Sequence, residues 1–207
     1  MMELWGRTNS VNVQKVIWLL EELALPYRRI DAGGAFGVVD TPAYRTLNPN
    51  GRVPTLVDGE VVLWESNAIL RYLALKTAAH GLYPEDPADR GRIERWMDWT
   101  LSTVGGAMHG MFWGLVRTPP EKRDPDAIER SRAASESCWR LLDAHLTGRE
   151  HLEAGRFTLA DIPLGCYVHR WYAMPEIERP DLPYLRAWYE GLLARPAYAQ
   201  HVAQPLT

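Results

Sequence analysis

Two short segments in the N-terminal part of the chain carry residues whose types and spacing could bind a small polar molecule. Glu65 and Ser66 stand where an expected strand turns into an expected helix. A helix N-terminus presents unpaired backbone N–H groups and a partial positive charge, so it can hold a carboxylate, and the Ser66 hydroxyl can add a hydrogen bond. The structural alternative is an ordinary helix cap.

Upstream, Val53-Pro54 is the best candidate for a cis peptide bond, because an X-Pro bond favours trans by only about 0.5–1 kcal/mol.

The histidines and cysteines give no sign of a metal or redox site. The histidines that could suggest a metal match neither the HxxxH nor the HExxH spacing; they are His109, His151, His169 and His201. Cys138 and Cys166 form no CxxC pair, so neither a disulfide framework nor a cysteine zinc site is predicted. Cys166 is interpreted as a small buried hydrophobe, and Cys138 likewise. We expect no bound metal, and a reducing compartment.

The elements expected around the candidate residues form an α/β block that ends at residue 78. Short apolar runs predict strands, and apolar residues from Val13 to Ala24 recur at helical spacing until Pro26. The predicted elements, in order, are a strand at 2–6, a helix from 13 to 24, a strand at 27–31, a helix at 42–47, a hairpin at 55–58 and 61–63, and a helix at 65–78. This order predicts a small mixed sheet covered by helices, in which the first two strands can pair in parallel.

The second block is expected to be all helical. Residues 79–89 contain two prolines and a glycine with little periodicity, which is typical of a linker. Beyond them the strand signals disappear, and helical patterning predicts helices at 90–116, 126–146, 158–173 and 183–194. Thr158 and Asp161 have the spacing of a capping box, with Asp in place of Glu. Its loss should cost about 1 kcal/mol, and more if Asp161 is buried. We therefore expect two domains, at 1–78 and 90–207.

The composition restricts the class of protein. The 207 residues are 46% hydrophobic and 24% charged, close to the average for globular proteins, which excludes a disordered or collagen-like chain. With 23 basic and 26 acidic residues the net charge is -3, so nucleic acid is not an expected partner. No apolar stretch reaches membrane-spanning length, and the start of the chain lacks a secretory signal pattern. We expect a cytoplasmic protein with no membrane partner.

Four motifs occur together in one order along the chain. They are Ser10 to Val16, Asn48 to Leu56, Glu65 to Ile69, and Thr158 to Asp161. In these positions they resemble the cytosolic glutathione transferase family, specifically its bacterial Ser-type, theta-like or nu-like members, and the resemblance covers essentially the whole chain. It implies a thioredoxin-like N-terminal domain that binds glutathione as co-substrate, a helical C-terminal domain that supplies most of the second-substrate pocket, a homodimer, and a role in detoxification.

The resemblance also assigns the glutathione-binding residues. The backbone of Val53, before Pro54, is expected to pair with the cysteinyl part of glutathione like an added strand. Glu65 and Ser66 are expected to hold the γ-glutamyl end, the acid taking its amino group and the serine its carboxylate. Arg52 is expected to reach the glycyl carboxylate, although an exposed loop arginine often has no specific role.

An enzyme that uses glutathione as a nucleophile must stabilise its thiolate, because a thiol with a pKa near 8.5 is only a few per cent ionised at neutral pH. A hydroxyl donor could contribute about 1.5–3 kcal/mol and a helix N-terminus about 0.3–1, against the ~2.7 kcal/mol of a two-unit shift. The resemblance assigns this role first to Ser10, which matches the catalytic hydroxyl of Ser-type members, and second to the Asn12 amide. Ser10 as a plain helix cap is the structural alternative.

The acceptor pocket follows from the resemblance as well. The electrophile is expected over the sulfur, against Trp5 or Arg7 and against a helix that carries Met108, Met111, Phe112 and Trp113. Methionine and aromatic side chains form an adaptable apolar wall, but at helical spacing they also suit a core.

Two other functions stay open. The same site could support glutathione-dependent disulfide or peroxide reduction, which Asn12 keeps open, or the chain could be a non-catalytic glutathione-binding scaffold. The presence of Ser10, Glu65 and Ser66 disfavours a retired site. A maleylacetoacetate isomerase would need a Ser-Ser-Cys start to the first helix, which residues 8–12 lack.

Overall fold

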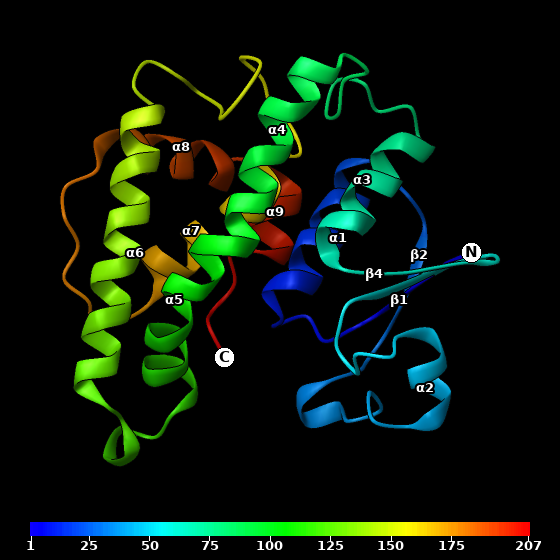
Figure 1. The fold of residues 1–207 in the computed structure, drawn as a ribbon, viewed down its shortest axis with the longest axis horizontal. Coiled ribbons are helices and arrows are strands. Elements are labelled where there is room, and N and C mark those ends of the chain that lie inside the picture. Colours follow the sequence, from blue (N-terminus) through cyan, green and yellow to red (C-terminus); the bar gives the residue numbers. More distant parts are fainter. The chain divides into compact units, whose positions relative to one another are not determined.

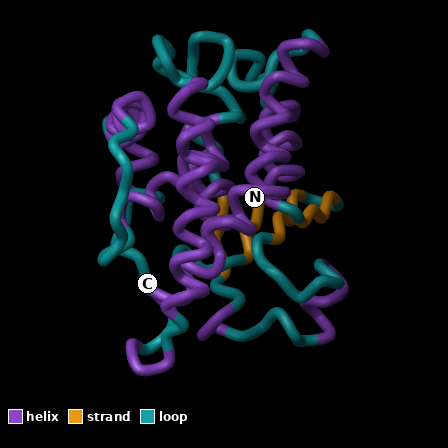
Figure 2. The backbone as a smooth tube through the Cα atoms, turned by 60° about the vertical axis from the view of Figure 1, so that its left-hand side comes forward, coloured by secondary structure: helices purple, strands orange, loops and turns teal.

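The computed structural model describes residues 1–207 in full, and the chain divides into two compact units, Met1–Tyr83 and Pro84–Thr207. The first unit contains a four-stranded sheet and helices, whereas the second contains helices and no strand (Figure 1). In Figure 2 the strands, drawn in orange, lie together in one sheet. The expected α/β fold followed by an all-helical part is confirmed.

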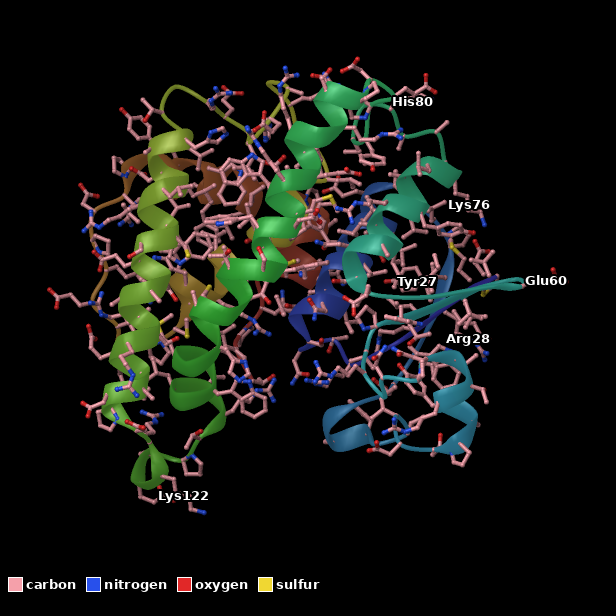
Figure 3. All side chains as sticks on the ribbon, viewed as in Figure 1. Tyr27, Arg28, Glu60, Lys76, His80 and Lys122 are labelled. Atoms are coloured by element: carbon pink, nitrogen blue, oxygen red, sulfur yellow. The ribbon has the colours of Figure 1, made fainter.

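The sheet of the first unit has the order β2-β1-β3-β4. Its strands are β1 (Met2–Trp5), β2 (Tyr27–Ile30), β3 (Thr55–Asp58) and β4 (Val61–Trp64). β1 pairs in parallel with β2 and antiparallel with β3, and β3 and β4 form the predicted hairpin, whose turn carries Glu60 (Figure 3). The parallel pair requires a crossover, which the first helix supplies.

The helices of the first unit are α1 (Val11–Glu22), α2 (Pro42–Leu47) and α3 (Ser66–Lys76), with a short 3₁₀ turn at Gly34–Phe36. α1 and α3 pack against each other, and their apolar faces are fully buried at Val16 and Leu70. Leu4 of β1 and Leu56 of β3 are buried with them. At the far end of α3 lies Lys76, which is labelled in Figure 3. It forms an ion pair with Asp58 of β3. This core holds the first residues of both helices in place.

The second unit begins with a nearly continuous helical path. It comprises α4 (Pro87–Trp99), a π-helical turn at Thr100–Val104, α5 (Gly105–Phe112) and a second π-helical turn at Trp113–Arg117. After a 3₁₀ turn at Pro120–Lys122 follow α6 (Pro125–His145), α7 (Asp161–Ala173), α8 (Pro183–Leu193) and α9 (Pro196–His201). The six-residue α9 was not predicted from the sequence. No helix combines the length and the apolar character that a membrane crossing requires.

The expected linker at 79–89 is too long at its C-terminal end. Helix α4 already begins at Pro87, where the carboxylate of Asp86 accepts hydrogen bonds from the backbone N–H groups of Ala88 (3.0 Å) and Asp89 (2.9 Å). Proline is well suited to the first helical position, since its missing N–H is not needed there. One of the two prolines that suggested a linker, Pro87, is therefore the first residue of a helix.

The predicted box at Thr158 and Asp161 forms, but in a modified way. One Asp161 carboxylate oxygen accepts from the backbone N–H of Thr158 at 2.9 Å, as expected of a capping box. The other accepts from the N–H of Leu152 at 3.2 Å and the indole Nε1–H of Trp188 at 2.9 Å. The Thr158 hydroxyl accepts from Ala160, and the helix itself begins at Asp161 instead of residue 158. Asp161 is 0% exposed, so it joins three segments inside the second unit.

His169 of α7 anchors the end of the chain. Its Nε2 lies 2.8 Å from the carbonyl oxygen of Gln204, so this nitrogen must carry the proton, and its Nδ1 lies 3.0 Å from the Tyr189 hydroxyl. The ring is buried, and burial together with the nearby Arg170 cation lowers the pKa of His169 below its usual value of 6.5. The folded protein therefore holds this histidine in its neutral form.

We expect His169 to make the protein less stable as the pH falls. Between the unfolded pKa near 6.5 and the lowered folded pKa, the unfolded state binds more protons, so this contribution is present above pH 6.5 and is lost on acidification. Urea unfolding of the wild type and of His169→Gln between pH 8 and 5.5 should give free energies of unfolding that converge as the pH falls. Parallel pH profiles for the two proteins would contradict this role.

Candidate functional site

A cavity of about 300 Å³ lies in the first unit. Its lining residues are Asn12, Asn48, Asn50, Arg52, Val53, Pro54, Glu65 and Ser66. All but Asn48 and Asn50 were predicted as binding residues from the sequence. Four separate elements of the unit contribute to this lining: α1, the segment after α2, the turn before β3, and the start of α3. The fold therefore brings most of the predicted binding residues to one place.

The N-termini of α1 and α3 meet at the cavity. Asn12 is the second residue of α1 and Ser66 the first of α3, and the Ser66 hydroxyl donates a 3.4 Å hydrogen bond to Asn12 Oδ1. Each helix start presents backbone N–H groups that have no partner within the helix, together with a partial positive charge. Two such ends on one cavity favour a negatively charged ligand.

Glu65 links β4 to α3 in a backbone conformation that side chains rarely adopt. Its φ is 69° and its ψ is 111°, in a region that favours glycine. Such a conformation costs about 1–3 kcal/mol and persists only where the surrounding structure imposes it, most often at binding sites. Here it lets the chain turn from the strand into the helix while Glu65 lines the cavity.

Replacing Glu65 should separate stability from binding. Glu65→Gly is expected to raise the free energy of unfolding by about 1 kcal/mol, because glycine adopts this φ without strain, and the gain exceeds its cost in the unfolded chain. Glu65→Gln keeps the strain and should show no such gain. Both variants should bind the predicted ligand, glutathione, about tenfold more weakly, since both lose the carboxylate. Chemical denaturation and calorimetric titration would test this, and a glycine variant no more stable than the glutamine variant would disprove it.

The turn before β3 contains the expected cis peptide bond between Val53 and Pro54. The preceding carbonyl, that of Arg52, accepts hydrogen bonds from the Tyr44 hydroxyl at 2.6 Å and from Asn48 Nδ2 at 2.8 Å. Tyr44 and Asn48 are both buried, so two side chains from the interior of the unit hold this carbonyl in place. The anchor fixes the position of Val53 and Pro54 on the cavity wall.

Asn48 and Asn50 are site residues that the sequence analysis did not assign. The side-chain oxygen of Asn48 accepts from the backbone N–H and the side-chain amide of Asn50, at 3.0 and 3.1 Å. The Asn-Pro-Asn-Gly segment opens one of the four motifs that carry the family resemblance, but neither asparagine was given a role in binding. Two amide side chains just before a candidate cis proline were the available signal, because buried asparagines usually tie loop backbone together.

Ser10 occupies the N-cap position of α1 and is 8% exposed, but its side chain makes no capping hydrogen bond. Its backbone carbonyl accepts the first helical bond, from Gln14 at 2.9 Å. Ser10 is not among the residues that line the cavity, whereas Asn12 is. Because the Ser10 side chain makes no capping hydrogen bond, it does not act as an ordinary helix cap, which was the structural alternative for this residue.

The six residues predicted to hold an acceptor fall into two groups. Trp5 packs edge-on against Tyr44, with ring centroids 5.8 Å apart. Arg7 lies beside Gly33, where an added Cβ would be 3.1 Å from Arg7 Nη1 and 3.3 Å from a methyl group of Val53. Neither residue lines the cavity, although Arg7 lies close to Val53, which does.

The other four acceptor residues belong to the second unit. Met108, Met111 and Phe112 are buried, whereas Trp113 is 51% exposed and contacts the ring of His109 at 5.8 Å. Of these four, Trp113 is the residue that can face a ligand without rearrangement. That these six residues line a single acceptor pocket stays a prediction.

No three histidine, cysteine, aspartate or glutamate side chains gather as a metal site would require. Cys138 and Cys166 are both free and buried, and burial raises the pKa of the Cys138 thiol, which makes it less reactive.

Comparison with known proteins gives the same result for both units. The model of the glutathione S-transferase N-terminal domain matches residues 9–76, and that of the C-terminal domain matches residues 125–191. The chain is 42% identical to glutathione S-transferase GstB of Escherichia coli, with 100% of each chain covered.

Two solved structures resemble the chain over nearly all of its length. The theta class glutathione S-transferase of Xanthomonas axonopodis pv. citri, with glutathione bound, is 52% identical, with 100% of this chain and 99% of that chain covered and a TM-score of 0.96. The glutathione transferase URE2P6 of Phanerochaete chrysosporium, in complex with oxidized glutathione, is 30% identical, with 96% and 93% covered and a TM-score of 0.85.

Proposed function

The chain belongs to the glutathione S-transferase family and is a glutathione transferase, and we propose that it activates the thiol of glutathione at the cavity formed by the starts of α1 and α3. The activated thiolate attacks an electrophilic, apolar acceptor. The observation that carries this proposal is the convergence of Asn12, Val53 and Ser66 on one cavity from three separate elements. The relative from Xanthomonas axonopodis, whose structure contains glutathione, supports the choice of ligand.

The charges along the cavity suit the three parts of glutathione. The γ-glutamyl carboxylate binds at the N-terminus of α3 through Ser66, and the amino group beside it binds the carboxylate of Glu65. The backbone of Val53 pairs with the cysteinyl residue, because Val53 precedes β3 and takes no part in the β1–β3 register. Arg52 binds the glycyl carboxylate. Glutathione is thus held at both ends, with its sulfur between them.

The chemistry requires that the bound thiol loses its proton at neutral pH. Ser10 and Asn12 are the proposed hydrogen-bond donors to the sulfur, and the partial positive charge of the α1 N-terminus adds to them. The thiolate sulfur then forms a bond to an electrophilic carbon of the acceptor, and the leaving group departs with the bonding electron pair. The residues proposed to contact this acceptor are Trp5 or Arg7, together with the helix that carries Met108, Met111, Phe112 and Trp113.

A glutathione-dependent disulfide reductase is the second candidate. It is favoured by the Asn12 amide, a neutral donor that lines the cavity. The relative from Phanerochaete chrysosporium binds oxidized glutathione. A non-catalytic glutathione-binding scaffold is the third.

The assembly and location follow the same proposal. We propose a homodimer, and the edge strand β4 supports it, because Val61, Val62 and Trp64 expose apolar side chains there. Sedimentation at micromolar concentration should show the dimer.

We propose that the enzyme is cytoplasmic, because its two cysteines would stay reduced there, and that it serves to detoxify electrophiles.

Two assays on one preparation test the function. Conjugation of glutathione to a chlorodinitrobenzene and reduction of a small glutathione disulfide are measured for the wild type and for Ser66→Ala. We expect conjugation to dominate, and the variant to need about tenfold more glutathione. Ser137→Ala, which alters an exposed serine of α6, is the matched control and should behave like the wild type. Disulfide reduction without conjugation would favour the second candidate, and glutathione binding without either reaction the scaffold.

A further inference from the structure

Lys15 of α1 is a fully buried cation, with 0% of its surface exposed. A buried ammonium group is costly unless hydrogen bonds compensate for its lost hydration. Its Nζ donates a 2.9 Å hydrogen bond to Oδ1 of Asn12, one turn earlier on the same helix. A buried charge is thus directly bonded to a residue that lines the cavity.

This bond determines which side of the Asn12 amide faces the ligand. Oδ1 accepts from Lys15 Nζ at 2.9 Å, and this bond remains when the Ser66 hydroxyl, 3.4 Å from Oδ1 here, turns to donate to the carboxylate of glutathione. The reversed orientation would place the amide N–H groups against an ammonium group, which has no acceptor to offer. The Asn12 Nδ2–H groups are therefore the part of this side chain that stays available to a ligand.

We propose that Lys15 is a positioning residue, which holds Asn12 with its amide N–H groups toward the sulfur of glutathione and so assists formation of the thiolate. The inference rests on the proposed function. Lys15 itself does not line the cavity and acts through Asn12. A cation on the amide oxygen polarises the amide, which makes its N–H groups stronger donors to a charged sulfur. The charged side chains on the cavity wall, Arg52 and Glu65, act directly, the first favouring the thiolate and the second opposing it.

The test measures the thiol pKa of glutathione bound to the intact protein, from the ultraviolet thiolate band as a function of pH. Lys15→Met fills a similar volume without charge or donor, and we expect it to raise this pKa by up to about one unit, a tenfold loss of thiolate near neutral pH. Lys15→Arg restores the cation and the donor and should recover most of the shift. Lys122→Met, at an exposed site (Figure 3), is the matched control and should leave the pKa unchanged.

A double variant separates positioning from a structural role. In an Asn12→Ala background, Lys15→Met should have no further effect on the thiol pKa, because the residue through which it acts is gone. An equal shift in both backgrounds, or no shift in Lys15→Met while the wild type lowers the thiol pKa, would overturn the inference and leave the proposed function standing. If Lys15→Met fails to fold, Lys15→Gln takes its place in the same cycle. An ordinary thiol pKa in the wild type would overturn both.

Discussion

Asp161→Ala is expected to lower the free energy of unfolding by about 3–5 kcal/mol, the largest effect on stability that we predict for this chain. The carboxylate is fully buried and accepts from Thr158, Leu152 and Trp188. Alanine removes the acceptor but leaves these donors inside the protein, and each buried unpaired donor costs about 1–3 kcal/mol. Denaturant unfolding followed by circular dichroism would measure the loss.

Asp124 offers the matched control. It caps α6 by accepting from the backbone N–H of Ala127 at 3.0 Å, in an exposed position. Asp124→Ala should cost only about 1 kcal/mol, the usual value of a cap, because water can replace the lost bond. If the two variants are destabilised equally, burial of Asp161 adds nothing, and Asp161 is no more than a helix cap.

Ser10→Ala is expected to have the largest effect on catalysis. It should lower kcat/KM for conjugation about 10²-fold, because it removes a donor to the developing charge, and should raise the thiol pKa of bound glutathione toward the free value. Affinity for glutathione should change little, because a donor to the charged sulfur stabilises the thiolate far more than the neutral thiol that binds first. Stopped-flow assays and thiolate titration would measure these quantities.

Asn12→Ala is the comparison for Ser10→Ala. Its expected loss in kcat/KM is about tenfold, since the resemblance makes Ser10 the first and Asn12 the second donor to the sulfur. A reversed order would assign the thiolate chiefly to Asn12, whose amide does line the cavity. An unchanged thiol pKa in both variants would remove the start of α1 from the mechanism.

Local rules predicted the parts of this protein that short segments control. The helix at Pro42–Leu47 has its predicted bounds, and the hairpin from Thr55 ends one residue later than expected. The cis bond before Pro54 is confirmed. It was predictable because an X-Pro bond pays a much smaller cost for the cis form than any other peptide bond. The bond from Asp161 back to Thr158 spans three residues and is confirmed as well. Each depends on a few neighbouring residues.

Other features had no local signal. Lys15 stands in an ordinary amphipathic helix pattern, and nothing in its neighbours indicates that a lysine there is fully buried. Asn48 was given no role in the site, although it donates to the Arg52 carbonyl from a buried position. The additional partners of Asp161, Leu152 and Trp188, lie 9 and 27 residues away. A single sequence gives the residue type at each of these positions but not which of these side chains contact one another in the folded protein.

Periodicity and proline placement therefore predicted the α/β and helical parts, because these depend on interactions within a few residues. The family and most of the residues around the cavity came from the resemblance that four motifs carry in order along the chain. The meeting of Asn12 with Ser66, 54 residues apart, the strained backbone at Glu65 and the burial of Lys15 and Asp161 arise only when α1, α3 and the sheet pack together. Burial and long-range hydrogen bonds set the energies of these groups, and both are properties of the packed chain.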